Sequence, residues 1–161
     1  MIAVVMGVSG SGKTTIGSAA AARLGWQFLD GDDFHPPENV AKMSAGKPLT
    51  DDDRWPWLDR LNAELRERET RGESAMLACS ALKQAYRDRL SRGLTDWRLV
   101  FLDGSFELLR QRMKERKHRY MPASLLQSQF ATLEPPADAI RIDVAEPFER
   151  CVEKIRAALQ L

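Results

Sequence analysis

The sequence has little cysteine, no long apolar run and almost no net charge. Its two cysteines, Cys79 and Cys151, show neither the spacing of a metal site nor a disulfide framework, so we expect reduced thiols and a cytoplasmic protein. The formal net charge of +1 gives no overall field that would attract nucleic acid or a membrane surface. The apolar stretch before the first glycine is too short for a signal peptide or a membrane span. The composition therefore argues against nucleic-acid-binding and membrane-bound classes of protein.

The proportions of hydrophobic and charged residues are those of a globular protein, and their order along the chain indicates an α/β fold. The 161 residues are 43% hydrophobic and 29% charged, which suits one domain with a real core, and we treat 1–161 as a single domain. Short apolar runs alternate with amphipathic segments, which predicts a parallel sheet flanked by helices. The expected strands are residues 2–6, 26–30, 74–79, 97–102 and 139–144. Helices are expected at residues 15–24, 39–43, from 51 onward, within 80–92, and at 105–116, 124–133 and 147–160.

The glycine-rich stretch at residues 7–14 reads Gly-Val-Ser-Gly-Ser-Gly-Lys-Thr and fits the phosphate-binding loop G-x-x-x-x-G-K-[ST]. It stands between a predicted strand and a predicted helix, whereas a glycine-rich turn that binds nothing is the alternative. The glycines let backbone amides point at phosphate oxygens, Lys13 can reach the β- and γ-phosphates, and Thr14 can ligate Mg²⁺. We predict a nucleoside triphosphate site, with Lys13 catalytic, formed by Gly7, Ser9, Gly10, Ser11, Gly12, Lys13, Thr14 and Thr15.

Acidic residues follow the second predicted strand. Asp30 and Asp32 are two residues apart, so on an extended segment both carboxylates would face the same way. Phosphoryl transfer to an alcohol needs one carboxylate that orients the hydroxyl and accepts its proton, and another acid can hold Mg²⁺. We assign Asp32 as the catalytic base and Asp30 as a metal ligand beside Thr14, with an acidic surface turn as the alternative. On the same loop, His35 is expected to position the substrate, with a histidine that only makes structural hydrogen bonds as the alternative.

Basic residues follow the third predicted strand and the fourth. Lys83 and Arg87 have i, i+4 spacing, so on one helix face their charges would converge on the carboxylate of an anionic acceptor. The later run at residues 110–119 places Arg112 and Arg116 on a shared helix face. It predicts a mobile lid at about 112–127 that closes over ATP, with Arg116 stabilising the transferring phosphoryl group. Solvated helix faces are the alternative in both cases, and the later run lacks the interleaved aromatics of a nucleic-acid site.

Several segments together resemble the gluconokinases, a branch of the P-loop small-metabolite kinases related to shikimate kinase. The most specific segments are Asp-Asp-Phe-His-Pro at 32–36 and Asp-Arg-Trp-Pro-Trp-Leu at 53–58, and the match continues through Cys79–Lys83 and Ser128–Phe130. In the lid, residues 116–121 read Arg-Lys-His-Arg-Tyr-Met, where the family often has Arg-x-Gly-His-Phe-Met. This departure leaves the role of His118 open.

The resemblance implies a three-layer sandwich with a five-stranded parallel sheet. It also implies transfer of the ATP γ-phosphoryl group to the 6-hydroxyl of D-gluconate with Mg²⁺, and a cytoplasmic homodimer. The residues expected to bind the substrate are Asp32, His35, Arg54, Lys83, Arg87 and Gln129, and Arg112 and Arg116 are expected on the nucleotide.

Two other functions remain open on the sequence. Another small-molecule kinase is the first, although shikimate kinase would be expected to show Gly-Gly-Gly after the third strand, where this chain has Cys79-Ser80-Ala81. The second is a nucleotide switch, although the guanine-reading motif N-K-x-D is absent.

Overall fold

The core of the fold is a parallel sheet. The computed structural model describes residues 1–115 and 123–160. Five strands pair in the order β2-β3-β1-β4-β5, and every pairing is parallel. The strands are β1 (Ile2–Met6), β2 (Gln27–Asp30), β3 (Ala75–Ala78), β4 (Trp97–Asp103) and β5 (Ile140–Asp143). The predicted five-stranded parallel sheet is therefore confirmed, with strand ends within one residue of the expected positions.

The central strand β1 shows why its sequence is an unbroken apolar run. All five of its residues are buried, because helices cover both faces of the sheet. Successive side chains point to opposite faces, so Ala3 and Val5 enter one core cluster and Ile2, Val4 and Met6 enter the other. These two clusters form the hydrophobic cores on either side of the sheet.

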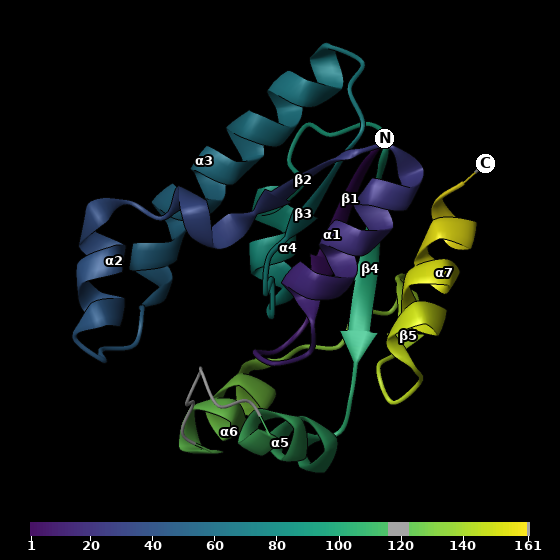
Figure 1. Cartoon of the computed structure of the whole chain (residues 1–161). Coiled ribbons are helices and arrows are strands. Elements are labelled where there is room, and N and C mark those ends of the chain that lie inside the picture. The colour runs from purple at the N-terminus through teal and green to yellow at the C-terminus, as the bar shows by residue number, and fades with distance from the viewer. Residues whose placement is uncertain (116–122, 161) are drawn as a thin grey trace.

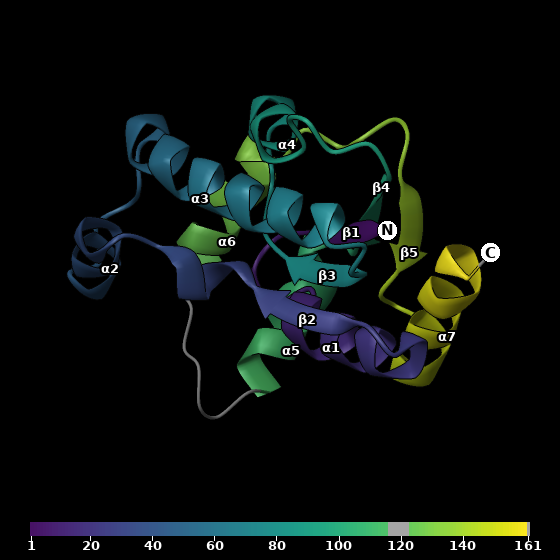
Figure 2. The same cartoon turned by 90° about the horizontal axis from the view of Figure 1, so that it is seen from above.

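The helices form a layer on each face of the sheet. Figures 1 and 2 show α1 and α7 together on one face and α3 and α4 on the other. The short α2 projects beyond the edge strand β2 (Figure 1). The helix bounds are α1 (Lys13–Leu24), α2 (Pro37–Ser44), α3 (Asp51–Thr70), α4 (Gln84–Leu90), α5 (Phe106–Glu115), α6 (Ala123–Thr132) and α7 (Phe148–Leu159). In the described part of the chain, no helix combines the length and apolarity needed to cross a bilayer.

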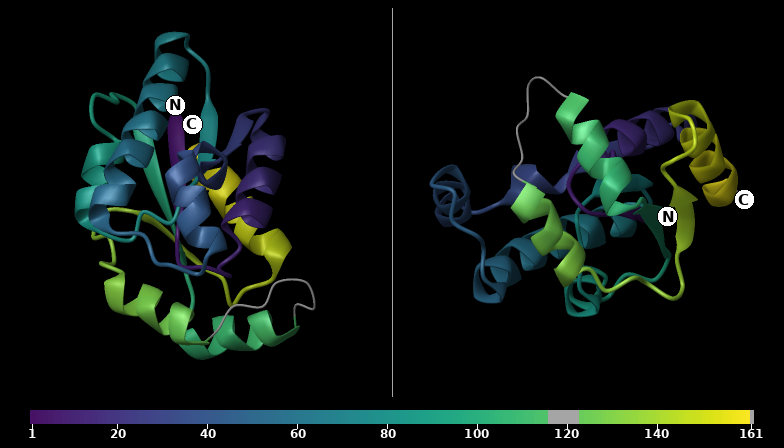
Figure 3. Two further views of the ribbon diagram at one scale, coloured as in Figure 1. Left: turned by 90° about the vertical axis from the view of Figure 1, so that its left-hand side faces the viewer. Right: turned by 90° about the horizontal axis from the view of Figure 1, so that it is seen from below.

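Helices α5 and α6 lie below the carboxyl ends of the strands (Figure 1), and the view from below in Figure 3 shows both of them at that end of the molecule. Ligands of open parallel sheets bind at this edge. The predicted lid at about 112–127 falls partly on these helices, whereas residues 116–122, with Arg116 and His118, lie outside the described residues. The fold thus gathers the P-loop, the loops after β2 and β3, and both of these helices at one end of the sheet.

The start of α3 is held by a reciprocal cap. Asp53 N–H donates to Thr50 Oγ1, and Thr50 N–H donates to the Asp53 carboxylate. Lys42 of α2 also donates to this carboxylate at 2.7 Å, which ties α2 to α3. The Lys42 ammonium and the Thr50 amide lower the pKa of Asp53 to about 2. Asp53 therefore links the two helices that follow the candidate catalytic loop.

Acid should remove the contribution of Asp53 to stability. Its pKa is lower in the folded chain than in the unfolded chain, so the contribution is complete above the unfolded value of 3.8 and is lost as the pH falls through about 2. We expect the urea midpoint of the wild type to fall more steeply over this range than that of Asp53→Asn. The exposed Asp52→Asn is the matched control, and equal pH dependence in the wild type and Asp53→Asn would contradict this account.

Candidate active site

The P-loop connects β1 to α1 and curls around the side chain of Lys13. Gly10 and Gly12 have φ angles of 81° and 97°, which residues with a Cβ rarely adopt, so glycine is required at both bends. The half-buried Lys13 reaches back across the loop, and its Nζ donates to the carbonyls of Gly7 at 3.0 Å and Val8 at 3.1 Å. Burial lowers the pKa of Lys13. The loop therefore has a desolvated cation at its centre, as a phosphate site requires.

Next to the loop, a hydroxyl and a carboxylate meet. Thr14 Oγ1 donates to Asp30 Oδ2 at 3.1 Å, so the two predicted metal ligands lie side by side. Such hard oxygen donors suit Mg²⁺, which usually binds through one or two protein oxygens, several waters and substrate phosphates. The described residues hold no cluster of three or more histidine, cysteine or acidic side chains that could form an all-protein metal cage. The donor set fits a nucleotide-bound Mg²⁺.

The expected extended arrangement of Asp30 and Asp32 is wrong. Residues Gly31–Phe34 form a 3₁₀ turn instead, because Asp30 Oδ1 accepts the N–H of Asp32 at 3.0 Å and caps the turn. Gly31 is buried beside the end of β3, where an added Cβ would lie 2.8 Å from the Ala78 carbonyl oxygen. Asp30 thus contacts both the P-loop threonine and the backbone of Asp32, whose carboxylate is exposed.

His35 ends the same turn and is buried. Its ring stacks on Trp57 of α3 with centroids 4.2 Å apart and planes 15° from parallel. The Trp57 indole N–H donates to the Gly31 carbonyl at 2.8 Å, so the stack is anchored to the turn. Burial lowers the pKa of His35. A neutral imidazole is thereby held beside Asp32.

A cationic cluster lies where α3 meets α4. Lys83 Nζ is 3.5 Å from Asp51 Oδ2, and Arg54 Nη1 is 3.6 Å from Asp51 Oδ1. The Tyr86 hydroxyl also donates to Asp51, and it is the largest cause of the lowered pKa of this carboxyl. Both cations lie within 5.5 Å of the Tyr86 ring centroid. Lys83 and Arg54, predicted from distant parts of the sequence, therefore share one site, and Asp51 is their carboxylate partner.

Arg87 does not join Lys83 on a helix face, and the predicted convergence is wrong. Lys83 is the residue immediately before the first turn of α4. The guanidinium of the buried Arg87 donates to the carbonyl oxygens of Ala81, Leu82 and Glu134. Ala81 has a φ of 45°, an uncommon value for a residue other than glycine. These loop carbonyls need a buried donor, so Arg87 holds the loop in shape rather than presenting its charge to a ligand.

Gln129 lies against the P-loop, not in the cationic cluster. Its Oε1 accepts the N–H of Ser9 at 2.6 Å, and its Nε2 donates to Ser9 Oγ at 2.8 Å. The structure therefore places this predicted substrate ligand on the nucleotide side. Arg112 is half-buried on α5. Ser11 is buried and bonds the Val8 carbonyl, and Thr15 is exposed at the start of α1.

Comparisons with known proteins show the family. A family model described as AAA domain matches residues 2–136. The thermosensitive gluconokinase of Escherichia coli (strain K12) is 45% identical, covering 97% of this chain and 86% of that protein. The crystal structure of a gluconokinase from Sinorhizobium meliloti 1021 is 48% identical with a TM-score of 0.86, covering 98% of this chain and 90% of that chain. The chain belongs to the gluconokinase family.

This membership confirms the resemblance to gluconokinases that the sequence segments indicated, and it confirms the prediction that the protein is an enzyme. A shikimate kinase from Bacteroides thetaiotaomicron, 18% identical with a TM-score of 0.65, covers 100% of this chain and 99% of its own length and shares the fold. The relation to shikimate kinase is thus one of architecture.

In this member of the gluconokinase family, sequence reasoning missed two polar residues of the site. Asp51 pairs with both predicted substrate cations, and Asn39 lies within hydrogen-bonding distance of His35. Asn39 follows His35 by four residues across the start of α2, and that spacing could have indicated it. Asp51 had no such signal, because an acidic first turn is ordinary helix chemistry.

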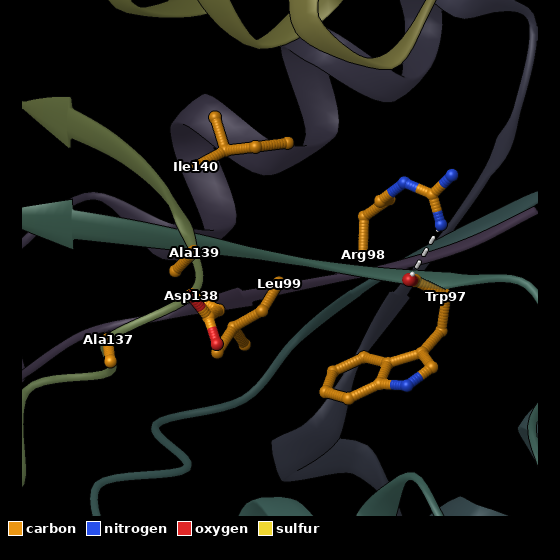
Figure 4. Close-up of a pocket in the computed structure, with 7 residues that line it drawn as sticks. All are labelled: Trp97, Arg98, Leu99, Ala137, Asp138, Ala139 and Ile140. Atoms are coloured by element: carbon orange, nitrogen blue, oxygen red, sulfur yellow. Dashed lines mark hydrogen bonds between the residues drawn. The ribbon is translucent and has the colours of Figure 1, made fainter.

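A hollow of about 530 Å³ lies far from these groups along the sheet. It is lined by residues 97–99 at the start of β4 and residues 137–140 leading into β5 (Figure 4). The amino ends of these strands form its wall, whereas the P-loop follows the carboxyl end of β1. Its charged side chains, Arg98 and Asp138, are not accompanied by nucleophiles or metal ligands in the lining. The candidate active site described above lies at the opposite edge of the sheet.

Proposed function

We propose that the chain transfers the γ-phosphoryl group of ATP to the 6-hydroxyl of D-gluconate, giving 6-phospho-D-gluconate and ADP. Family membership supports this reaction. The observation that carries it is the position of Asp30. One of its carboxylate oxygens accepts from Thr14 of the P-loop, and the other accepts from the backbone of Asp32. A single side chain thereby joins the groups that would hold the phosphoryl donor to the candidate base.

The proposed reaction is in-line displacement. Lys13 and the loop amides hold the phosphates, and Asp32 orients the 6-hydroxyl and takes its proton. The bond from the sugar oxygen to the γ-phosphorus forms as the bond from that phosphorus to the β–γ bridging oxygen breaks. Thr14 and Asp30 would hold Mg²⁺, which supplies charge neutralisation on the phosphates. Lys83 and Arg54 are assigned to the gluconate carboxylate, which would replace Asp51 as their partner.

We also propose a lid over the nucleotide, assembly into a homodimer and a cytoplasmic location. Arg112 and Arg116 would cover the nucleotide from a lid at about 112–127 within a single domain. Homodimer formation and a cytoplasmic location follow the family resemblance, and the two free cysteines are compatible with a reducing compartment.

A coupled ADP-release assay tests the reaction. Initial rates are measured with D-gluconate, shikimate and a set of nucleoside monophosphates as acceptors, at saturating ATP and Mg²⁺. We expect turnover with gluconate alone. Turnover with another acceptor would identify a different small-molecule kinase, and ATP hydrolysis that needs no acceptor would favour a nucleotide switch.

Removing the Lys83 charge should weaken gluconate binding. We expect Lys83→Ala to raise the KM for gluconate about tenfold or more with a smaller effect on kcat, because a hydrogen bond to a charged group contributes about 1.5–3 kcal/mol. Arg89→Ala is the matched control, since Arg89 lies on α4, the helix that follows Lys83, but pairs with Asp59. Initial rates at varied gluconate give both constants, and an unchanged KM would remove Lys83 from the acceptor site.

A further inference from the structure

His35 is fixed in a way that the proposed reaction does not by itself require. Its side chain is only 4% exposed and is clamped by the Trp57 stack. Each ring nitrogen has a polar neighbour on a different element: Nδ1 lies 3.2 Å from Asn39 Nδ2, and Nε2 lies 3.8 Å from Asp32 Oδ1. The position of the single proton on a neutral imidazole therefore decides how the ring interacts with Asp32.

Asn39 settles that position. It is buried, and its Nδ2 also lies 2.9 Å from the Asp53 carbonyl oxygen. A carbonyl can only accept, so the amide group must direct its nitrogen toward Asp53, and the same nitrogen then faces His35 Nδ1. With an N–H donor in front of it, Nδ1 must be the unprotonated acceptor. The ring proton consequently lies on Nε2, the nitrogen that faces Asp32.

We propose that Asn39 is a positioning residue that fixes His35 as the Nε2–H tautomer, so that His35 donates a hydrogen bond to the Asp32 carboxylate and orients it for catalysis. This inference rests on the proposed function, in which Asp32 is the base. At 3.8 Å the pair is beyond hydrogen-bonding distance, but the Asp32 side chain is 86% exposed and free to rotate toward the ring. The opposite tautomer would present a lone pair to a carboxylate and repel it.

The charges around His35 are consistent with a neutral donor. Burial lowers its pKa, Asp32 opposes that shift, and the Arg54 guanidinium reinforces it. Asn39 adds no charge. Asn39 is in turn held by the start of α3, where Lys42 and Thr50 bind the Asp53 side chain. The contacts that hold α2 on α3 therefore also fix the position of Asn39, which in turn orients His35 beside the candidate base Asp32.

Two substitutions of His35 distinguish the roles of its two ring nitrogens. The amide nitrogen of Gln lies near the position of Nε2, and that of Asn lies near the position of Nδ1. We expect His35→Gln to keep kcat within about threefold and His35→Asn to lose about tenfold or more, the effect of one hydrogen bond to a charged group. The KM for ATP should stay within about twofold in both variants. Equal kcat values in the two variants would overturn the proposal.

The tautomer itself is measured in the free protein by long-range ¹H–¹⁵N correlation spectra. The chain has two histidines, so His118→Gln assigns the second set of signals. We expect Nε2–H in the wild type, and Nδ1–H or the doubly protonated ring in Asn39→Asp, which replaces the donor by an acceptor. That variant should also lose about tenfold or more in kcat. Nδ1–H in the wild type, or full kcat in a folded Asn39→Asp variant, would contradict the inference.

Failure of this inference is separable from failure of the proposed function. The wild-type assay with gluconate tests the reaction, whereas the tautomer reports on Asn39 without any substrate. Thermal unfolding of each variant verifies that it is folded, and the two His35 variants keep the test valid if Asn39→Asp loosens the contact with Asp53.

Discussion

Replacing Asp32 with asparagine is expected to lower kcat for gluconate by about 10²–10⁴-fold, the usual contribution of a general base. The substitution keeps the shape of the side chain and removes its ability to take a proton. The backbone N–H that Asp30 accepts is unchanged, so the 3₁₀ turn should persist. Because Asp32 makes no hydrogen bond to the P-loop among the described residues, ATP affinity should barely change. Initial rates and equilibrium ATP titration measure the two effects.

Asp33→Asn is the matched control for Asp32. Both carboxylates are exposed on the same turn, so either substitution removes one negative charge from the same surface. A general electrostatic effect would lower the two rates alike, whereas a proton-accepting role predicts a loss in Asp32→Asn only. Near-wild-type turnover of Asp32→Asn would eliminate Asp32 as the base.

Replacing Lys13 with methionine is expected to lower kcat/KM for ATP by about 10²-fold or more. Methionine preserves much of the side-chain volume but removes the cation that the loop encloses, and loss of a single electrostatic group at a reacting centre typically costs about 10²–10³-fold. Among the described residues, that cation donates to the Gly7 and Val8 carbonyls and to no other group. It is therefore available to exchange these carbonyls for phosphate oxygens.

Stability distinguishes this loss from unfolding. Burial lowers the pKa of Lys13, so its charge is disfavoured in the folded chain, and removing it should leave the urea midpoint unchanged or higher. Lys154→Met, at an exposed lysine of α7, is the matched control. A Lys13→Met variant that binds ATP with wild-type affinity and turns over normally would contradict the assignment.

The order and type of the elements could be predicted because each is locally encoded. Buried strands such as Ile2–Met6 are short apolar runs, and the helices carry apolar positions at helical spacing. The P-loop could be predicted for the same reason, since its glycines, Lys13 and Thr14 act through backbone geometry within one continuous stretch. Family membership followed from the segments at 32–36 and 53–58, where residue identity is specific over several positions.

The mutual arrangement of the polar side chains was decided by tertiary structure. The i, i+4 spacing of Lys83 and Arg87 predicted that their two charges would lie on one helix face. In the structure, the Arg87 guanidinium instead donates to the buried carbonyls of the loop before α4. Gln129 was directed to Ser9 by the docking of α6 under the P-loop. Ser9 lies far from Gln129 in the sequence. The Ala81 and Leu82 carbonyls lie close to Arg87 in the sequence, but only the fold buries them and so creates their need for a donor.

A parallel α/β kinase fold, its phosphate loop and its family can thus be predicted from the sequence, because they depend on local periodicity and on contiguous motifs. The contact of Asp30 with Thr14, the pairing of Asp51 with Lys83, and the contact of Asn39 with the Asp53 carbonyl follow instead from how the chain packs. A buried or paired polar group takes whichever partner the packed chain brings within hydrogen-bonding distance, and packing joins segments far apart in the sequence.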